Sequence, residues 1–278
     1  MTLLADLPEL SEEYPLSAEQ IASYQRDGHI VLRGVASARE VAAYRPYILE
    51  AVKRLNMEQR PLAARDTYGK AFLQIMNLWE KDEAVRRFVL ARRFARIAAE
   101  LMGVAGVRLY HDQALFKEAG GGLTPWHQDQ HYWPLETDHT ITMWMPLVAV
   151  TPEMGTMTFA SGSQRQGYLG DLSISDQSEE VLRRYVEERG FTLVNHGRMT
   201  AGDATFHAGW TLHSAPGNSS AVTREVMTII WIAENTRVIE PRNFSQKADL
   251  AKWFPGLKPG DLADSPLNPV VYSRSNPS

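Results

Sequence analysis

Three side chains able to hold a metal ion lie between positions 127 and 213. His127 and Asp129 stand two positions apart in the stretch 126–131. On a β-strand, residues two apart face the same side, so this imidazole and this carboxylate would point together. A second imidazole would complete a 2-His-1-carboxylate triad, which leaves metal positions open and suits non-haem iron(II). A His-x-Asp triplet alone is weak evidence, because it also occurs as a polar pair at a strand end.

A later histidine and arginine strengthen this interpretation. His213 is expected to end one strand and Arg224 to begin the next, so a hairpin turn at 218–219 would place them opposite one another. A buried guanidinium needs an anion. A dicarboxylate could chelate the metal at one end and pair bidentately with Arg224 at the other. The alternative is an ion pair between Arg224 and a local acid, Glu225 or Asp203.

The elements expected to position these groups are helices first and strands later. Ser17 with Gln20, and Ser37 with Glu40, have the spacing of capping boxes that begin helices. Apolar periodicity predicts helices over 38–55 and about 82–102, and a further helix over 177–189. Short runs rich in β-branched and aromatic residues predict these strands: 29–32, 107–116, 140–150, 156–160, 191–194, 203–213 and 225–233.

This order of elements predicts a mainly β protein, with a barrel or jelly-roll core buttressed by N-terminal helices. We expect one domain over 1–278: a mainly helical part to 106, a β-roll core over 107–234, and an extended C-terminal wrap over 235–278. The wrap is predicted from the six prolines after Asn235.

Composition narrows the chemistry. The chain has 278 residues and no cysteine, which excludes disulfides, thiolate nucleophiles, zinc–thiolate sites and iron–sulfur clusters. A formal net charge of -4, with both signs interspersed, gives no indication of a nucleic-acid or membrane partner. The N-terminus lacks a basic region followed by an apolar run, and no stretch approaches the length of a membrane span. We therefore expect a cytoplasmic protein.

Several motifs together resemble the phytanoyl-CoA dioxygenase (PhyH) family of iron(II)/2-oxoglutarate oxygenases over most of the chain. The separation of eleven residues between His213 and Arg224 also fits the family pattern. The matching stretches are 112–117, 126–129, 154–163 and 202–204, with His213, Asn218, Ser220 and Arg224.

The resemblance implies a double-stranded β-helix core in which His127, Asp129 and His213 bind Fe(II). It also implies that Gln113 and Trp144 line the 2-oxoglutarate pocket beside Arg224. The family often has Ser or Thr two residues after the distal histidine, but here that position is Ala215. Ser214 is a candidate replacement, although neighbours on a strand face opposite sides. Gln164 departs from the family's glycine-serine-histidine turn, and Asp129 distinguishes the chain from related halogenases, which lack that carboxylate.

Other polar and aromatic residues are candidates for contact with the substrate. His207 is the main rival to His213 as the distal ligand, but no arginine follows it at the family separation. The substrate-site candidates are Gln74, Asn77, His131, Tyr132, Trp133 and Trp210, although aromatic core packing is the commoner use of such rings.

The resemblance implies a reaction with Fe(II), 2-oxoglutarate and O₂. Oxidative decarboxylation would release succinate and CO₂ and couple to hydroxylation of an aliphatic C–H, with desaturation or ring closure as variants. The expected partner is a small-molecule substrate or biosynthetic intermediate, and the expected assembly is a monomer or homodimer. Two alternatives remain: a cupin-like metal-dependent hydrolase or isomerase, and a non-catalytic barrel that binds a small molecule.

Overall fold

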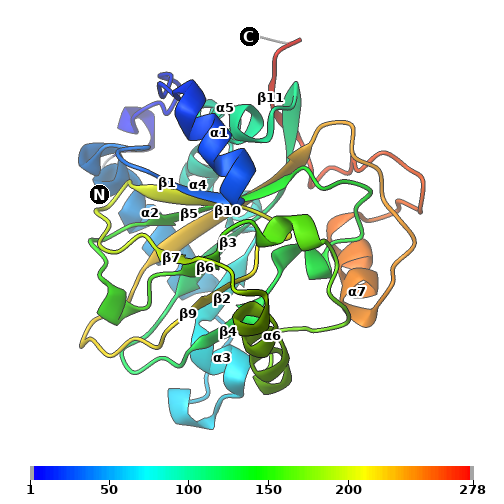
Figure 1. Cartoon of the computed structure of the whole chain (residues 1–278). Helices are drawn as coiled ribbons and strands as arrows, with labels where there is room; N and C mark the ends of the chain where they lie inside the picture. Colours follow the sequence, from blue (N-terminus) through cyan, green and yellow to red (C-terminus); the bar gives the residue numbers. More distant parts are fainter. Residues whose placement is uncertain (1–2, 276–278) are drawn as a thin grey trace.

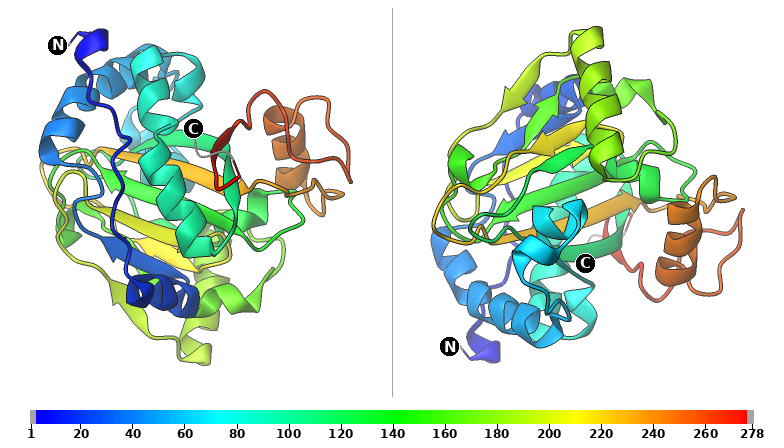
Figure 2. Two further views of the ribbon diagram at one scale, coloured as in Figure 1. Left: turned by 90° about the horizontal axis from the view of Figure 1, so that it is seen from above. Right: turned by 90° about the horizontal axis from the view of Figure 1, so that it is seen from below.

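Two antiparallel β-sheets form the body of the protein in the computed structural model, which describes residues 3–275. The larger sheet has the strand order β1-β8-β5-β10-β3-β11, with β2 also paired to β3. The smaller sheet has the order β4-β9-β6-β7. N-terminal helices cover one face of the larger sheet, as seen from above in Figure 2. The predicted helix-buttressed jelly roll is therefore confirmed.

The helices of the N-terminal part begin where their capping boxes predict. The side chains of Ser17 and Ser37 each accept a hydrogen bond from the backbone N–H three residues on, and the backbone N–H of each serine donates to the side chain of that residue, Gln20 or Glu40. The stretch 82–102, predicted as one helix, forms two helices, because the helical conformation is interrupted at residues 90–91. The helices are α1 (Ala18–Asp27), α2 (Ala38–Leu55), α3 (Thr67–Ala71), α4 (Glu83–Val89), α5 (Arg92–Met102), α6 (Asp176–Arg189) and α7 (Phe244–Trp253). Short 3-10 turns are η1 (Leu4–Asp6), η2 (Leu62–Ala64), η3 (Leu78–Glu80), η4 (Asp129–Tyr132), η5 (Pro152–Met154) and η6 (Ser163–Gln166).

The strands of the larger sheet are long enough to carry a core on one face and a site on the other. They are β1 (His29–Leu32), β2 (Leu73–Met76), β3 (Gly106–Phe116), β5 (Thr140–Pro146), β8 (Ala204–Ala208), β10 (Val226–Ala233) and β11 (Val270–Ser273). Phe88 and Phe94 of the helices pack into one fully buried cluster with Trp231 of β10. Burying a side chain of this size stabilises the fold by about 1.5–3 kcal/mol. This cluster fixes the sheet that carries the functional side chains.

The smaller sheet comprises β4 (Thr124–His127), β6 (Thr158–Ala160), β7 (Leu193–Asn195) and β9 (His213–Ala215). One prediction was wrong here: the stretch 203–213 is not one strand but β8 and β9, which belong to different sheets. Gly209 lies at the break, and a β-carbon there would meet Thr140 Oγ1 at 2.2 Å. The chain therefore passes close against β5 at this glycine and then crosses to the smaller sheet.

The C-terminal segment is less extended than predicted. It contains α7 and β11 in addition to its proline-rich turns. The side chains of Asn243 and Gln246 donate hydrogen bonds to the carbonyl of His131, at 3.4 and 3.3 Å. These bonds dock α7 against η4, the turn that begins with Asp129 (Figure 1).

Candidate metal centre and co-substrate pocket

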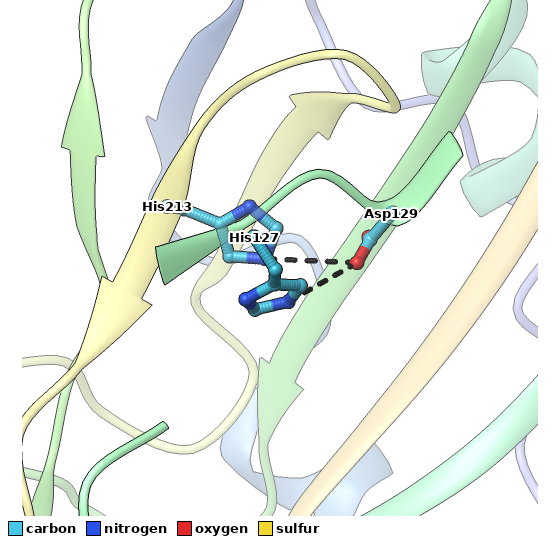
Figure 3. Close-up of side chains that lie close together, drawn as sticks. All are labelled: His127, Asp129 and His213. Atoms are coloured by element: carbon cyan, nitrogen blue, oxygen red, sulfur yellow. Dashed lines mark ion pairs between the residues drawn. The ribbon is translucent and has the colours of Figure 1, made fainter. Parts of the chain in front are cut away.

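The two histidines of the predicted triad are neighbours in the smaller sheet. His127 ends β4 and His213 begins β9, and the two residues are direct partners in the antiparallel ladder. Their ring centroids lie 4.1 Å apart, and both side chains are buried. Figure 3 shows both rings turned toward Asp129. Strand pairing therefore brings together two imidazoles that are 86 positions apart, the difference between 213 and 127.

Backbone carbonyls set which nitrogen of each ring is free. His127 Nδ1 lies 2.7 Å from the carbonyl of Pro125, and His213 Nδ1 lies 2.9 Å from the carbonyl of Thr211. A carbonyl only accepts, so each Nδ1 carries the proton and donates. Each Nε2 then keeps its lone pair, which is the tautomer that binds a metal ion.

Asp129 presents one carboxylate oxygen to the histidines and holds the other away. Its Oδ1 lies 3.4 Å from Nε2 of His127 and 3.7 Å from Nε2 of His213. Its Oδ2 accepts hydrogen bonds from Thr142 Oγ1 and from His207 Nε2, both at 3.0 Å. Because two donors occupy Oδ2, Oδ1 is the oxygen left for a metal. His207 therefore contacts the carboxylate through Oδ2, and it is His213 whose Nε2 lies near Oδ1.

The charge state of these groups suits a cation. Burial, and then the neighbouring His127 and His207, lower the pKa of His213 well below its ordinary value, so its ring is neutral and Nε2 keeps its lone pair. One ligand atom from each of His127, Asp129 and His213 lies within 4.8 Å of the others. Two lone pairs and one anionic oxygen thus face a common point, which is unfavourable unless a positive ion lies between them. The residues fit a mononuclear divalent metal such as iron(II).

The convergence is as predicted, but its geometric origin is different. Asp129 does not continue a strand, because β4 ends at His127 and Asp129 opens the 3-10 turn η4. The turn redirects the carboxylate into the cavity, and the strand-alternation explanation was therefore wrong.

Arg224 is a buried cation without an acidic partner among the described residues. It is 2% exposed, and its Nη1 donates to the carbonyl of Gly155 while its Nε has no hydrogen-bond partner. Burial lowers its pKa to about 9. The two local acids that could have neutralised it are engaged elsewhere: Glu225 pairs with Arg45 at 2.6 Å, and Asp203 with Arg33 at 3.0 Å. The guanidinium lies over the ring of Trp144, 5.2 Å from its centroid.

The predicted hairpin between His213 and Arg224 is absent. β9 pairs with β4 and β6, whereas Arg224 forms an isolated bridge with Lys117 before β10 begins. The loop between β9 and β10 crosses from one sheet to the other. Both side chains nevertheless line the same cavity, because the two sheets face each other there.

Thr124 is a polar residue of this pocket that the sequence interpretation missed. It lies directly opposite Ala215 in the β4–β9 ladder and lines the cavity with Arg224. The buried Lys117 donates from Nζ to Thr124 Oγ1 at 3.2 Å and to the carbonyl of Gly122. Because Thr124 accepts this bond, its own O–H remains free to donate. The signal in the sequence was a threonine three residues before His127, on the strand that pairs with Ala215.

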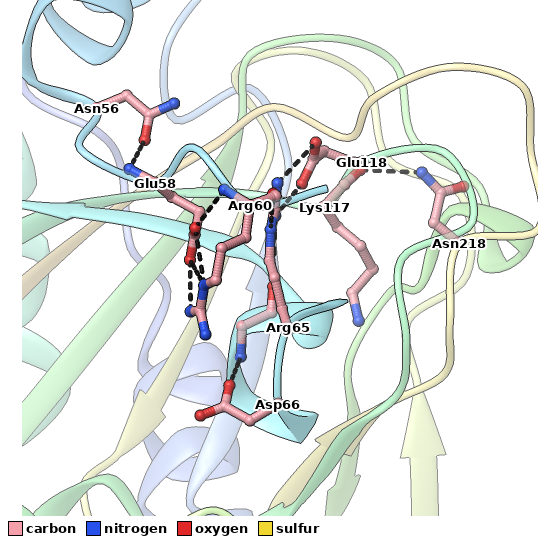
Figure 4. Close-up of polar contacts among 9 residues, drawn as sticks. Asn56, Glu58, Arg60, Arg65, Asp66, Lys117, Glu118 and Asn218 are labelled. Carbon is pink, nitrogen blue, oxygen red and sulfur yellow. Dashed lines mark hydrogen bonds and ion pairs between the residues drawn. The ribbon is translucent and has the colours of Figure 1, made fainter. Parts of the chain in front are cut away.

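The Lys117 segment also anchors one wall of the cavity. Burial, and then the charge of Arg224, lower the pKa of Lys117 to about 6. The next residue, Glu118, forms an ion pair with Arg65, and Asp66 caps α3 by accepting from the N–H of Gly69 (Figure 4). These contacts hold α3 beside the metal centre.

The cavity has a volume of about 260 Å³ and contains the triad and Arg224. Six other predicted residues line it: Gln74, Gln113, Tyr132, Trp133, Trp144 and Ser214. Lining residues that were not predicted include Tyr68, Phe72, His111, Thr124, Thr142 and Asp249.

Three of the predicted substrate residues do not line this cavity. Asn77 has a left-handed backbone after β2, with φ 51°, and its side chain donates to Glu80. His131 turns toward Ser173, with Nε2 3.1 Å from the serine Oγ. Trp210 donates from Nε1 to Asp138 at 2.8 Å. Each side chain is oriented by a partner outside the cavity, and sequence spacing could not reveal those partners.

A jelly roll with a buried 2-His-1-carboxylate centre and an unpaired arginine defines a mononuclear metal-dependent oxygenase site. The model of the phytanoyl-CoA dioxygenase (PhyH) family matches residues 24–226, and the chain belongs to this family.

Relatives of known activity agree with this assignment. Ectoine dioxygenase from Bordetella parapertussis is 30% identical over 244 residues, covering 80% of this chain and 77% of that protein. The non-haem α-ketoglutarate-dependent carbocyclase SnoK from nogalamycin biosynthesis has a similar structure, with a TM-score of 0.75, 24% identity, and coverage of 92% and 97% of the two chains. The epimerase SnoN, solved with Fe³⁺, α-ketoglutarate and nogalamycin RO, gives a TM-score of 0.72, 27% identity, and coverage of 91% and 98%.

Proposed function

We propose that this protein is an Fe(II)- and 2-oxoglutarate-dependent dioxygenase that hydroxylates an aliphatic C–H of a small molecule and releases succinate and CO₂. The observation that carries the proposal is one cavity holding both a metal triad and a buried, unpaired guanidinium. Family membership and the named activities of the relatives support the same reaction class. Iron and 2-oxoglutarate supply, when bound, the activation of O₂ that amino-acid side chains cannot provide.

The chain's own residues have distinct tasks in this scheme. His127, His213 and Oδ1 of Asp129 would hold the metal, while Thr142 and His207 donate hydrogen bonds to the other oxygen of Asp129, Oδ2, and keep it turned to them. With these three ligands, iron would supply the positions needed for co-substrate and O₂.

Arg224 and Thr124 bind the far carboxylate of 2-oxoglutarate. The guanidinium supplies charge and direction. The Thr124 hydroxyl takes the place of the family's Ser or Thr donor, which is Ala215 here. Ser214 also lines the cavity, so it is a second available hydroxyl.

Gln113 is a further proposed co-substrate donor. Its side-chain oxygen accepts a hydrogen bond from Gln74, whose own oxygen accepts from the hydroxyl of Tyr68 at 2.7 Å. This chain of bonds orients the Gln113 amide with its NH₂ group free to donate. The ring face of Trp144 contacts the guanidinium of Arg224 in a cation–π interaction, which helps to hold that side chain in place.

The remaining cavity wall, aromatic and largely buried, fits a small molecule or biosynthetic intermediate. Within residues 3–275, no helix has the length and apolar character needed to cross a membrane. We propose a single catalytic domain that acts in the cytoplasm as a monomer or homodimer.

The test is anaerobic addition of Fe(II) and 2-oxoglutarate, followed by exposure to O₂. The expected results are a visible absorption band from the iron–2-oxoglutarate chelate and then succinate formation. His213→Ala should lose both, whereas His139→Ala, which changes an exposed histidine outside the cavity, should keep both. Absence of the band and of succinate in the wild-type protein would reject the proposal.

A further inference from the structure

A second carboxylate lines the cavity, from a part of the chain beyond the segment that matches the family. Asp249 of α7 lines the cavity, and the family match ends at residue 226. Its Oδ2 accepts a hydrogen bond from Tyr110 at 2.6 Å, which fixes the carboxylate against β3. Docking of α7 onto η4 holds this acid in the wall. Asp249 is therefore a fixed feature of the substrate side of the site.

The described residues place no cation within ion-pair distance of Asp249. Lys252, three residues later on the same helix, lies over the ring of Trp253, 4.3 Å from its centroid. Its Nζ also lies 3.7 Å from Sδ of Met76. Burial raises the pKa of Asp249 to about 7, as expected for a carboxylate that lacks a paired charge.

The surroundings of Asp249 favour a positive ligand. Besides Trp144, which lies beside Arg224, four aromatic side chains line the same cavity: Tyr68, Phe72, Tyr132 and Trp133. Aromatic ring faces attract cations, and the attraction grows when the site is desolvated. His111 also lines the cavity, is 3% exposed, and has an Nδ1 with no hydrogen-bond partner. Burial lowers the pKa of His111 to about 3, so its ring is neutral and can accept a hydrogen bond.

We propose that the substrate carries a basic amine, which binds as an ammonium group against Asp249 among these aromatic rings. This inference rests on the proposed function, because it places the oxidised C–H between Asp249 and the metal triad. An ammonium group would supply the positive charge that balances the carboxylate of Asp249, together with N–H donors to it. A neutral or anionic group in the same position would leave Asp249 uncompensated.

The test uses benzylamine and its neutral counterpart, benzyl alcohol, as probes. Each is titrated anaerobically into the protein loaded with Fe(II) and 2-oxoglutarate, and binding is measured from the change in the chelate's absorption band. Benzyltrimethylammonium, which cannot ligate a metal, is included to exclude direct coordination of the amine. We expect benzylamine to bind at least about tenfold more tightly than benzyl alcohol, the effect of one charge-assisted hydrogen bond. Benzyltrimethylammonium has the charge but no N–H donor, so it should also bind more tightly than benzyl alcohol, through its charge and the ring faces alone.

Asp249→Asn keeps the shape of the side chain and should remove this preference, while Glu136→Gln, at an exposed acid outside the cavity, should retain it. Equal binding of cations and alcohol by the wild type overturns the inference, as does a preference that survives in Asp249→Asn. If the absorption band itself does not form, the proposed function fails instead, so the two failures are distinguishable.

Discussion

Replacing Arg224 with methionine should show separately how the buried charge affects the stability of the protein and how it contributes to 2-oxoglutarate binding. The pKa of Arg224 falls from its ordinary value to about 9, because burial penalises the charged form. This difference corresponds to about 5 kcal/mol of unfavourable charge burial when no anion is bound. Methionine removes the charge and occupies much of the same apolar space, and such replacements of buried charges are often neutral or stabilising. Without co-substrate, we expect Arg224→Met to be at least as stable as the wild type.

The same substitution should abolish the response to co-substrate. At a hundredfold excess over its dissociation constant, 2-oxoglutarate should stabilise the metal-loaded wild type by about 2.7 kcal/mol, which is a rise in Tm of several degrees. Loss of the arginine should weaken 2-oxoglutarate binding by at least about a hundredfold, so the rise should disappear.

Thermal unfolding with Mn(II), with and without 2-oxoglutarate, measures both quantities. Arg184→Met, which removes an exposed arginine on α6, is the matched control and should behave as the wild type. A strongly destabilised Arg224→Met protein that still gains stability from 2-oxoglutarate would show that the guanidinium has a structural partner and no role in co-substrate binding.

Three further predictions concern the neighbours of these groups. Thr124→Val should weaken 2-oxoglutarate binding about tenfold, because it removes one hydroxyl donor to a charged group, while the metal affinity stays unchanged. Calorimetry measures both affinities. An unchanged affinity for 2-oxoglutarate would indicate that Ser214 is the donor instead. His207→Phe should lower metal affinity by about 10–100-fold in a competition dialysis, because Oδ2 of Asp129 loses a donor and the carboxylate can rotate. Equal metal affinities of the variant and the wild type would contradict this positioning role of His207. Benzylamine should bind about tenfold more tightly at pH 8 than at pH 6, because Asp249, with a pKa of about 7, becomes ionised over that interval. The groups that face Asp249 are Lys252, His111 and the tyrosines Tyr68, Tyr110 and Tyr132. Burial lowers the pKa of His111 to about 3, and it raises the pKa of each tyrosine above its ordinary value, that of Tyr132 to about 12. A binding curve that is flat with pH, or a slope that persists in Asp249→Asn, would contradict this assignment.

Local signals in the sequence were sufficient for the helical part and for the identities of the metal ligands. The capping boxes at Ser17 and Ser37 depend on contacts within one turn, so they were predictable and are confirmed. Strand β1 and helix α2 have the predicted bounds for the same reason. The spacing of His127, Asp129, His213 and Arg224 indicated the site because the chemistry requires these residue types.

Long-range pairing was not readable from the sequence. The predicted hairpin placed His213 against Arg224, but His213 pairs with His127 and Arg224 with Lys117. Which strands pair depends on the whole set of contacts across both sheets, and a short strand such as β9 carries little information about its partner.

The sequence by itself determined the kind of reaction centre, since two imidazoles, one carboxylate and one arginine can be recognised by type and spacing. Only the tertiary structure decided that Thr124 lies opposite Ala215, that Oδ2 of Asp129 is occupied by hydrogen bonds while Oδ1 faces the histidines, and that Asp249 of α7 lines the cavity. The physical reason is that a ligand's chemistry belongs to its side chain, whereas its neighbours are set by packing between segments distant along the chain.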